Sequence, residues 1–362
     1  MKNTFGNSVA VTLFGESHGE YIGAVIDGLA PGITVNREYI AHQLAMRRPV
    51  GAISTPRREQ DAYRIVSGVV NDVTTGTPIT ILIPNEDVRS GDYAPMQTVA
   101  RPSHADYTAQ CKYHGHQDTR GGGHFSGRIT AALVAAGAVC RYALEQKGIH
   151  IGTHIQRCGG VADRDFGDYS TDIAALNQTA FAVLDEDCGQ RMQEAILAAA
   201  AEGDSVGGIL ETAVVGMPTG VGEPWFDTME GMLAHMLFSI PAVKGVEFGD
   251  GFALADQQGS TANDPLCITE GGIAAVTNHS GGINGGITNG SPLLFRTVIK
   301  PTPTIAKPQQ TVDMTTLTET VLEAKGRHDP AIVHRARAVQ DAATAIVLCD
   351  ALALRYGTDW LN

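Results

Sequence analysis

Four arginines lie close together near the N-terminus, in a segment that reads RRPVGAISTPRR. They are Arg47, Arg48, Arg57 and Arg58. A guanidinium group offers paired N–H donors that match the oxygens of a phosphate or carboxylate two at a time. The cluster therefore predicts a small, highly anionic ligand. For Arg57 and Arg58 alone, a solvated basic loop is an equally good interpretation.

Two histidines in turn-like segments could exchange protons with such a ligand. His18 lies in GESHG at 15–19, and His104 lies in RPSHAD at 101–106. An imidazole, whose ordinary pKa is near ~6.5, can act as an acid or a base at neutral pH. A single loop histidine is more often a plain polar residue, so the pair strengthens the prediction of an active site only modestly.

A glycine-rich segment at 120–128, RGGGHFSGR, runs directly into a predicted helix. The N–H groups of such a turn and the positive end of the helix dipole favour a phosphate. The spacing is neither that of a Walker A loop nor that of a GxGxxG fingerprint. With Arg101, Arg120 and Arg128 nearby in sequence, it supports an anionic ligand without indicating a nucleotide.

Three later segments could add to the same site. They are NHSGGINGG at 278–286, KPTPT at 300–304 and RHDP at 327–330. Each could be only a turn, and the Asp-Pro pair of the last segment also fits the start of a helix. Together these segments predict an enzyme or binding protein for a small phosphorylated, carboxylated molecule. They do not name the reaction.

The elements that must position these residues form a mixed α and β pattern. Alternation and β-branched residues predict strands at 8–13, 22–27, 78–83, 208–214 and 293–299. Length and Ala and Leu content predict helices at 36–47, 129–147, 189–202, 228–240 and 336–355. No repeat or linker divides the 362 residues, so one unit is favoured. The stretches 161–180 and 253–272 are expected to be insertions or surface loops.

Composition argues against several other classes of protein. The formal charge of -13 predicts a surface that repels nucleic acid and anionic membranes. The apolar stretch 129–140 is shorter than the ~20 residues that span a bilayer. The cysteines are never closer than 18 residues, so we predict no metal site. The N-terminal residues lack a signal-type apolar core, which predicts a cytoplasmic protein.

Taken in order, ten segments resemble those of the chorismate synthase family. They are FGESHG, RRP with RRE, RPSHADYT, RGGGHFSGR, GDSVGG, GEPWFD, SIPAVKGVEFG, NHSGGINGGITNG, KPTPTI and KGRHDP, from residue 14 to residue 330. The resemblance implies one α+β unit over 1–362, with helices between antiparallel sheets, an internal duplication and a homotetramer. It implies an anti-1,4-elimination of phosphate from 5-enolpyruvylshikimate 3-phosphate to give chorismate, the last common step of aromatic amino acid synthesis. The reaction is redox-neutral but requires reduced FMN.

The resemblance also implies roles for single residues. His18 matches the acid that helps the phosphate leave, and His104 matches the histidine that protonates reduced flavin. Asp329 matches a carboxylate that works through the flavin N5. Ser17 and Ser126 match serines that support these groups.

Cofactor and substrate contacts follow from the same resemblance. Flavin contacts are expected at His124, Phe125, Ser126, Pro241, Ala242, Gly285, Lys300, Pro301, Thr302, Pro303, Thr304 and Arg327. Substrate contacts are expected at Arg47, Arg48, Arg57, Arg58, Arg101 and Arg128. Because the chain has no nicotinamide fingerprint and no room for a reductase domain, a separate flavin reductase is expected.

Three segments depart from the family pattern, and two other functions stay open; the departures at 51–53 and 124–125 bear on the first of them. Residues 51–53 lack a usual arginine, His124 and Phe125 replace other residue types, and 335–338 differ after RHDP. A binding protein that has lost turnover is conceivable, although it would not explain why both histidines and Asp329 are kept. A flavin oxidoreductase with another substrate would consume NADPH. A purely structural protein is least favoured.

Overall fold

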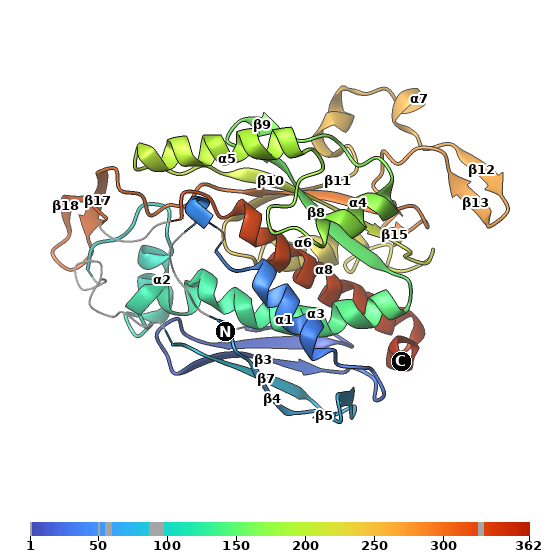
Figure 1. The fold of residues 1–362 in the computed structure, drawn as a ribbon, viewed down its shortest axis with the longest axis horizontal. Helices are drawn as coiled ribbons and strands as arrows, with labels where there is room; N and C mark the ends of the chain where they lie inside the picture. Colours follow the sequence, from blue (N-terminus) through green and yellow to red (C-terminus); the bar gives the residue numbers. More distant parts are fainter. Residues whose placement is uncertain (1, 50, 55–59, 87–97, 325–328) are drawn as a thin grey trace.

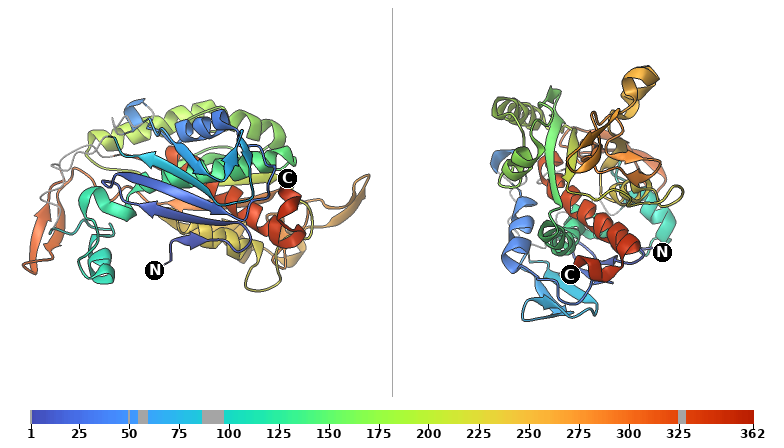
Figure 2. Two further views of the ribbon diagram at one scale, coloured as in Figure 1. Left: turned by 90° about the horizontal axis from the view of Figure 1, so that it is seen from below. Right: turned by 90° about the vertical axis from the view of Figure 1, so that its right-hand side faces the viewer.

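The computed structural model describes residues 2–49, 51–54, 60–86, 98–324 and 329–362. Two antiparallel five-stranded sheets enclose a layer of long helices (Figures 1 and 2). The first sheet has the strand order β1-β2-β3-β7-β4, and the second has the order β11-β16-β10-β8-β9. The predicted α+β architecture with helices between antiparallel sheets is therefore confirmed. The internal duplication stays a prediction.

The first sheet comes from the N-terminal part of the chain. Its strands are β1 (Thr4–Phe5), β2 (Ala10–Gly15), β3 (Tyr21–Asp27), β4 (Arg64–Ser67) and β7 (Ile79–Pro84), beside a small hairpin of β5 (Val69–Val70) and β6 (Val73–Thr74). In β7, Ile79, Ile81 and Ile83 are buried. This alternation gives the sheet one apolar face, which packs on the helix layer.

The second sheet is formed by β8 (His150–Cys158), β9 (Val161–Ala162), β10 (Gly208–Val215), β11 (Val243–Phe248) and β16 (Leu293–Ile299). Three hairpins lie outside it: β12 (Leu266–Thr269) with β13 (Gly272–Ala275), β14 (Ile283–Asn284) with β15 (Ile287–Thr288), and β17 (Gln309–Asp313) with β18 (Thr318–Leu322). Figure 1 shows β12 and β13 projecting from one end of the molecule and β17 and β18 from the other.

The central layer contains α1 (Arg37–Met46), α3 (Thr130–Gln146) and α8 (Val333–Tyr356). The other helices are α2 (Asp106–Tyr113), α4 (Tyr169–Leu176), α5 (Glu186–Ala201), α6 (Met229–Leu237) and α7 (Gly259–Ala262). Residues 127–146 are apolar and long enough to span a bilayer, but 83% of the most apolar window is buried. Because it packs between α8 and the sheets, α3 is a core helix.

All five predicted strands and all five predicted helices are present, with ends shifted by a few residues. The prediction of loops at 161–180 and 253–272 is wrong in part. The first stretch contains α4, which buries Ile173 and Leu176, and the second contains α7 and all of β12. In α4, only two buried positions carry large apolar side chains, so the helical period is hard to read from the sequence.

Candidate functional site

The turn after β2 carries the first predicted catalytic histidine. Ser17 and His18 are both buried there. The N–H of Ser17 donates to the carbonyl oxygen of Gly123 at 3.1 Å. This bond joins the His18 turn to the glycine-rich segment, about a hundred residues further along the chain.

The glycine-rich segment forms a left-handed turn between the two predicted catalytic histidines. Gly121, Gly122 and Gly123 have φ angles of 58°, 85° and 53°. A Cβ atom on Gly121 would lie 2.1 Å from the Cε1 atom of His18, and one on Gly122 would lie 3.5 Å from the Cε1 atom of His104. Both imidazoles therefore face the same turn, and glycine is needed both for its backbone and for the space.

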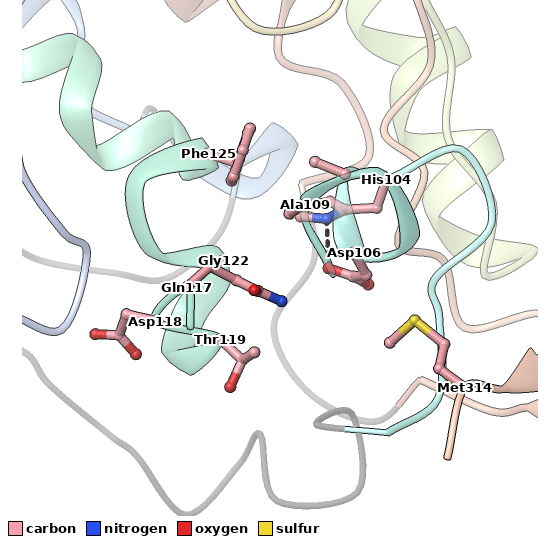
Figure 3. A pocket seen from close by; sticks show the side chains of 10 residues that line it. His104, Asp106, Ala109, Gln117, Asp118, Thr119, Gly122, Phe125 and Met314 are labelled. Carbon is pink, nitrogen blue, oxygen red and sulfur yellow. Dashed lines mark hydrogen bonds and ion pairs between the residues drawn. The ribbon is translucent and has the colours of Figure 1, made fainter. Parts of the chain in front are cut away.

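His104 lies in a hydrogen-bonded cluster at the start of α2. Its Nδ1 atom is 2.8 Å from Oδ1 of Asp106, and Figure 3 marks this contact with a dashed line. Arg101 donates to the same carboxylate through Nη2 at 2.7 Å and through Nε at 2.8 Å. Burial would raise the pKa of Asp106, but the hydrogen bonds from Arg101 and His104 outweigh burial and hold that pKa well below its usual range.

Two predicted flavin contacts lie beside the His104 turn. The Nζ atom of Lys300 donates to the carbonyl oxygen of Ser103, and the N–H of Lys300 donates to the carbonyl oxygen of Ala242 at 2.9 Å. Ser103 and Ala242 have φ angles of 57° and 75°, which are unfavourable for residues with a Cβ atom. Burial and the nearby charge of Lys244 lower the pKa of Lys300.

The residues after Lys300 are tied to the GDSVGG segment. Ser205 donates to the carbonyl oxygen of Thr302 at 2.8 Å, and Gln309 donates to that of Pro303 at 3.1 Å. The hydroxyl oxygen of Thr302 is buried and has no hydrogen-bond partner among the described residues. Such an orphaned group fits a site that receives a polar ligand.

Two arginines predicted to bind substrate contact a protein carboxylate that the sequence analysis missed. Arg47 and Arg128 are buried, and both reach Asp61. The Nη1 atom of Arg47 is 3.3 Å from Oδ2 of Asp61, and Nη1 of Arg128 donates to Oδ1. Arg47 also donates through Nε to the hydroxyl of Thr130 at 2.8 Å. These contacts fix the arginines in place.

Asn85 connects this arginine cluster to the His18 turn. It accepts a hydrogen bond from Nε of Arg128 at 3.0 Å. Its amide group donates to the carbonyl oxygens of Glu16 and Gly19 at 3.0 and 2.8 Å.

Arg48 donates to the carbonyl oxygen of Gln60. The remaining arginines of the prediction lie outside the described residues; they are Arg57, Arg58 and Arg327.

Asp329 lies before α8 and is held by an arginine from that helix. Nη1 of Arg335 is 3.0 Å from Oδ2 of Asp329, and Nε of Arg335 donates to the carbonyl oxygen of Arg47 at 3.2 Å. Next to this pair, Ser54 and His334 share a buried hydrogen bond of 2.7 Å. Burial, reinforced by the charge of Arg335, lowers the pKa of His334 to about 4.

His124 and Phe125 lie between two hollows in the surface. The Nδ1 atom of His124 is 2.8 Å from the carbonyl oxygen of Gly15, and Phe125 packs edge-on against Tyr113. A narrow hollow of about 20 Å³ has Phe125 on one side and His104 on the other (Figure 3). A larger one, of about 320 Å³, is lined by both His124 and Phe125. Ser126 accepts the backbone N–H of Arg128, so it caps the turn before α3.

Gly285 is not brought to this site within one chain. It lies between β14 and β15, near the beginning of β16, because Gly282 packs against the backbone of Ser291 and Pro292. Lys300 follows the other end of β16, and a seven-residue strand is about 20 Å long. Figure 1 likewise shows β15 far from α2 along the longest axis.

Comparison with known proteins gives one consistent result. The family model described as chorismate synthase matches residues 9–353. A chorismate synthase of Aeropyrum pernix is 44% identical over 355 residues, covering 98% of this chain and 93% of the relative. One of Thermococcus gammatolerans is 45% identical over 350 residues, covering 97% of each chain. The chain belongs to the chorismate synthase family.

The fold agrees with that assignment. A crystal structure of chorismate synthase superposes with a TM-score of 0.77 at 29% identity, covering 98% of this chain and 94% of the other. The family assignment thus confirms the resemblance found in the motifs, and it identifies the chain as a chorismate synthase family enzyme.

Proposed function

We propose that this chain removes phosphate from 5-enolpyruvylshikimate 3-phosphate to form chorismate, and so acts as a carbon–oxygen lyase. In this reaction the bond from C3 to the phosphate oxygen and a C6–H bond break, and a second ring double bond forms. The observation that supports it most is the position of one glycine turn between His18 and His104 in a chain that the family model matches over residues 9–353.

His18 is the proposed acid for the departing phosphate. Its side chain is buried against the turn at Gly121, where water has little access. A proton given to the bridging oxygen would offset the negative charge that develops as the C–O bond breaks. Ser17, whose hydroxyl would lie 2.9 Å from a Cβ atom on Gly121, supports the imidazole from the same turn.

Arginines are proposed to hold the phosphate and carboxylates of the substrate. Arg47, Arg128 and Arg335 come together through Asp61 and the Arg47 carbonyl, so several guanidinium groups gather beside the His18 turn. Fixed positive groups stabilise developing phosphate charge without having to reorganise during the reaction. Arg48, Arg57, Arg58 and Arg101 are proposed to complete this substrate-binding set.

Reduced FMN is the proposed cofactor, and the residues present fit it. The buried hydroxyl of Thr302 lacks a partner among the described residues, and it lies two residues after Lys300, whose Nζ atom reaches the His104 turn. When bound, reduced FMN would supply the electron-rich ring that takes up the C6 hydrogen. The proposed contacts are His124, Phe125, Ser126, Pro241, Ala242, Lys300, Pro301, Thr302, Pro303, Thr304 and Arg327. Gly285 is not among them, because it lies at the other end of β16 within one chain.

His104 and Asp329 are the proposed groups that hold or move protons near the flavin. Asp106 holds the imidazole of His104, and Arg335 holds the carboxylate of Asp329. Both are therefore oriented before the ligands bind. A separate flavin reductase is proposed to supply the reduced cofactor, in a cytoplasmic homotetramer.

An anaerobic assay tests the proposal. Purified protein is mixed with 5-enolpyruvylshikimate 3-phosphate and chemically reduced FMN, and chorismate absorbance and phosphate release are followed together. Equal release of both with no net flavin oxidation supports the lyase. Tight binding of substrate and flavin without product would favour a binding protein, and net oxidation of one reduced FMN for each product would favour an oxidoreductase.

A further inference from the structure

We infer that Asp106 is a positioning residue, which fixes the tautomer of His104 and aims its Nε2 atom at the glycine turn. The part of this inference that concerns catalysis rests on the function proposed above. The part that concerns the imidazole itself rests only on the geometry of the His104 turn.

The carboxylate of Asp106 cannot rotate freely. Oδ2 accepts the backbone N–H of Arg101 at 2.9 Å and its Nε–H at 2.8 Å, while Oδ1 accepts from Nη2 at 2.7 Å. The side chain of Asp106 is mostly buried, as is that of Arg101. A paired guanidinium–carboxylate contact of this kind has a defined plane, so Oδ1 offers His104 an acceptor in one direction.

The same contacts select a tautomer of His104. A carboxylate can only accept and a guanidinium can only donate. Nη2 of Arg101 carries two hydrogens; it donates one to Oδ1 of Asp106 at 2.7 Å and lies 3.0 Å from Nδ1 of His104. The contact of Nδ1 with the charged carboxylate oxygen is shorter, at 2.8 Å, which favours a proton on Nδ1. A proton on Nδ1 of His104 can then donate to Oδ1 at 2.8 Å. The lone pair stays on Nε2, on the far side of the ring.

The glycine turn leaves that far side accessible. A Cβ atom on Gly122 would lie 3.7 Å from Nε2 of His104, so Nε2 faces the backbone of the turn, and glycine places no side chain beside this nitrogen. Figure 3 shows His104 and Asp106 on one side of the narrow hollow and Gly122 and Phe125 on the other. Nε2 is therefore the atom that meets a ligand bound there.

A second contact holds the turn from the opposite side. Lys300 donates to the carbonyl oxygen of Ser103, the residue before His104. Ser103 has a φ of 57°, so the backbone at this point is kept in an unfavourable conformation by its neighbours. Because the backbone is fixed by Lys300 and the ring by Asp106, the imidazole is oriented before any ligand arrives.

The test is Asp106→Asn, read in two independent ways. In flavin-free protein, the nitrogen chemical shifts of a 15N-labelled His104 imidazole report the tautomer directly. We expect a proton on Nδ1 in the native chain and a mixture of both tautomers in the variant, because an amide can donate as well as accept. In the anaerobic assay, kcat should fall roughly 10- to 100-fold while KM for the substrate changes less than about 3-fold.

The matched control is Asp172→Asn. Asp172 also binds an arginine with both oxygens, Arg164 at 2.7 and 3.1 Å, and it accepts a backbone N–H, but it lies in α4. This variant should keep the native tautomer of His104 and the native kcat. Asp106→Glu retains a carboxylate acceptor and should keep the Nδ1–H tautomer. The same tautomer measurement can be made on this variant if Asp106→Asn does not fold.

Several results would overturn the inference. These are a native tautomer in Asp106→Asn, a native chain with the proton on Nε2, a loss of the Nδ1–H form in Asp106→Glu, and an equal effect of Asp172→Asn. If the native chain makes no chorismate, the proposed function fails, but the tautomer experiment still decides the role of Asp106.

Discussion

The turn around His104 and the interior around α8 both contain arginine paired with aspartate, but the two regions arrange these side chains differently. Inside the helix layer, Arg141 and Arg337 are each 1% exposed, and both contact Asp341, at 3.1 and 3.4 Å. Thr153 donates to the same carboxylate. In the interior, the buried positive charges are therefore paired with a buried carboxylate.

At the His104 turn the pairing is one-sided. Arg101 and Asp106 hold one edge of the imidazole, and the other edge faces a hollow across from Gly122. The difference teaches that arginines paired with an aspartate do not by themselves indicate an active site. What marks the site is backbone without side chains on the open edge, together with the strained turns at Ser103 and Ala242.

The interior pairing should matter for stability before it matters for activity. Asp341→Asn leaves Arg141 and Arg337 buried without their carboxylate, so the free energy of unfolding should fall by about 3 to 5 kcal/mol. Urea unfolding at pH 7 measures this. The control is Asp72→Asn, which removes the half-exposed ion pair with Arg37 and should cost less than about 1 kcal/mol. Equal losses in the two variants would contradict the comparison.

The glycine turn should show the opposite behaviour, with activity lost before stability. In Gly121→Ala the new Cβ atom would meet His18 at 2.1 Å, so kcat should fall at least ~100-fold, the scale of losing a general acid. Gly148→Ala is the matched control, because Gly148 also has a positive φ, of 76°, but no described atom lies within 4 Å of its Cβ position.

Both glycine variants share the backbone penalty of about 1 kcal/mol in unfolding free energy. Only Gly121→Ala should lose chorismate formation in the anaerobic assay. A Gly148→Ala enzyme as inactive as Gly121→Ala would mean that backbone strain alone explains the loss. A fully active Gly121→Ala enzyme would separate His18 from the reaction.

Two buried histidines should make opposite contributions to the pH dependence of stability. His334 has a pKa lowered to about 4, so it is neutral when folded, and its contribution is complete above pH 6.5. As the pH falls below that value, the unfolded chain binds a proton that the folded chain resists, and stability is lost. Between pH 6.5 and pH 5 the loss is about 2 kcal/mol.

His154 provides the contrast. It contacts Asp163 at 2.8 Å and Glu211 at 3.0 Å; burial would lower its pKa, but these two carboxylates outweigh burial and raise it. Its contribution is therefore complete below pH 6.5 and is lost as the pH rises through the raised value. Urea unfolding of native, His334→Asn and His154→Asn chains should show stability differences that run in opposite directions with pH. Parallel curves would contradict this assignment.

The sequence predicted the elements whose cause is local. The Ala-rich run of α3 and the alternating β-branched residues of β3 and β7 carry their period in their own composition. It did not predict β8, where Thr153 and His154 are fully buried. Those side chains are satisfied by partners from distant segments, which no periodic pattern reveals.

The residues of the candidate site also fall into those that local motifs predicted and those that only the fold brings together. The motifs marked His18, His104 and the glycine turn, because glycine clusters have a local meaning. They gave no sign of Asp61, which reaches Arg47 and Arg128 from 14 and 67 residues away in the chain. A single Asp in a loop has many possible partners, and only the fold selects among them. The spacing of Asp106 from His104 was visible, but its orientation was not.

The smallest expected effect is at His124, in the glycine-rich segment, where a substitution should change cofactor binding and not the chemical step. The ring of His124 contacts the carbonyl oxygen of Gly15 at 2.8 Å, but no step of the proposed reaction uses its proton. His124→Ala should therefore weaken FMN binding about 5- to 10-fold, the effect of losing about 1 kcal/mol from one hydrogen bond, and leave kcat at saturating FMN unchanged. Flavin titration and the anaerobic assay measure the two quantities. Native FMN affinity with lost turnover would instead place His124 beside His18 and His104 among the groups that act on the substrate.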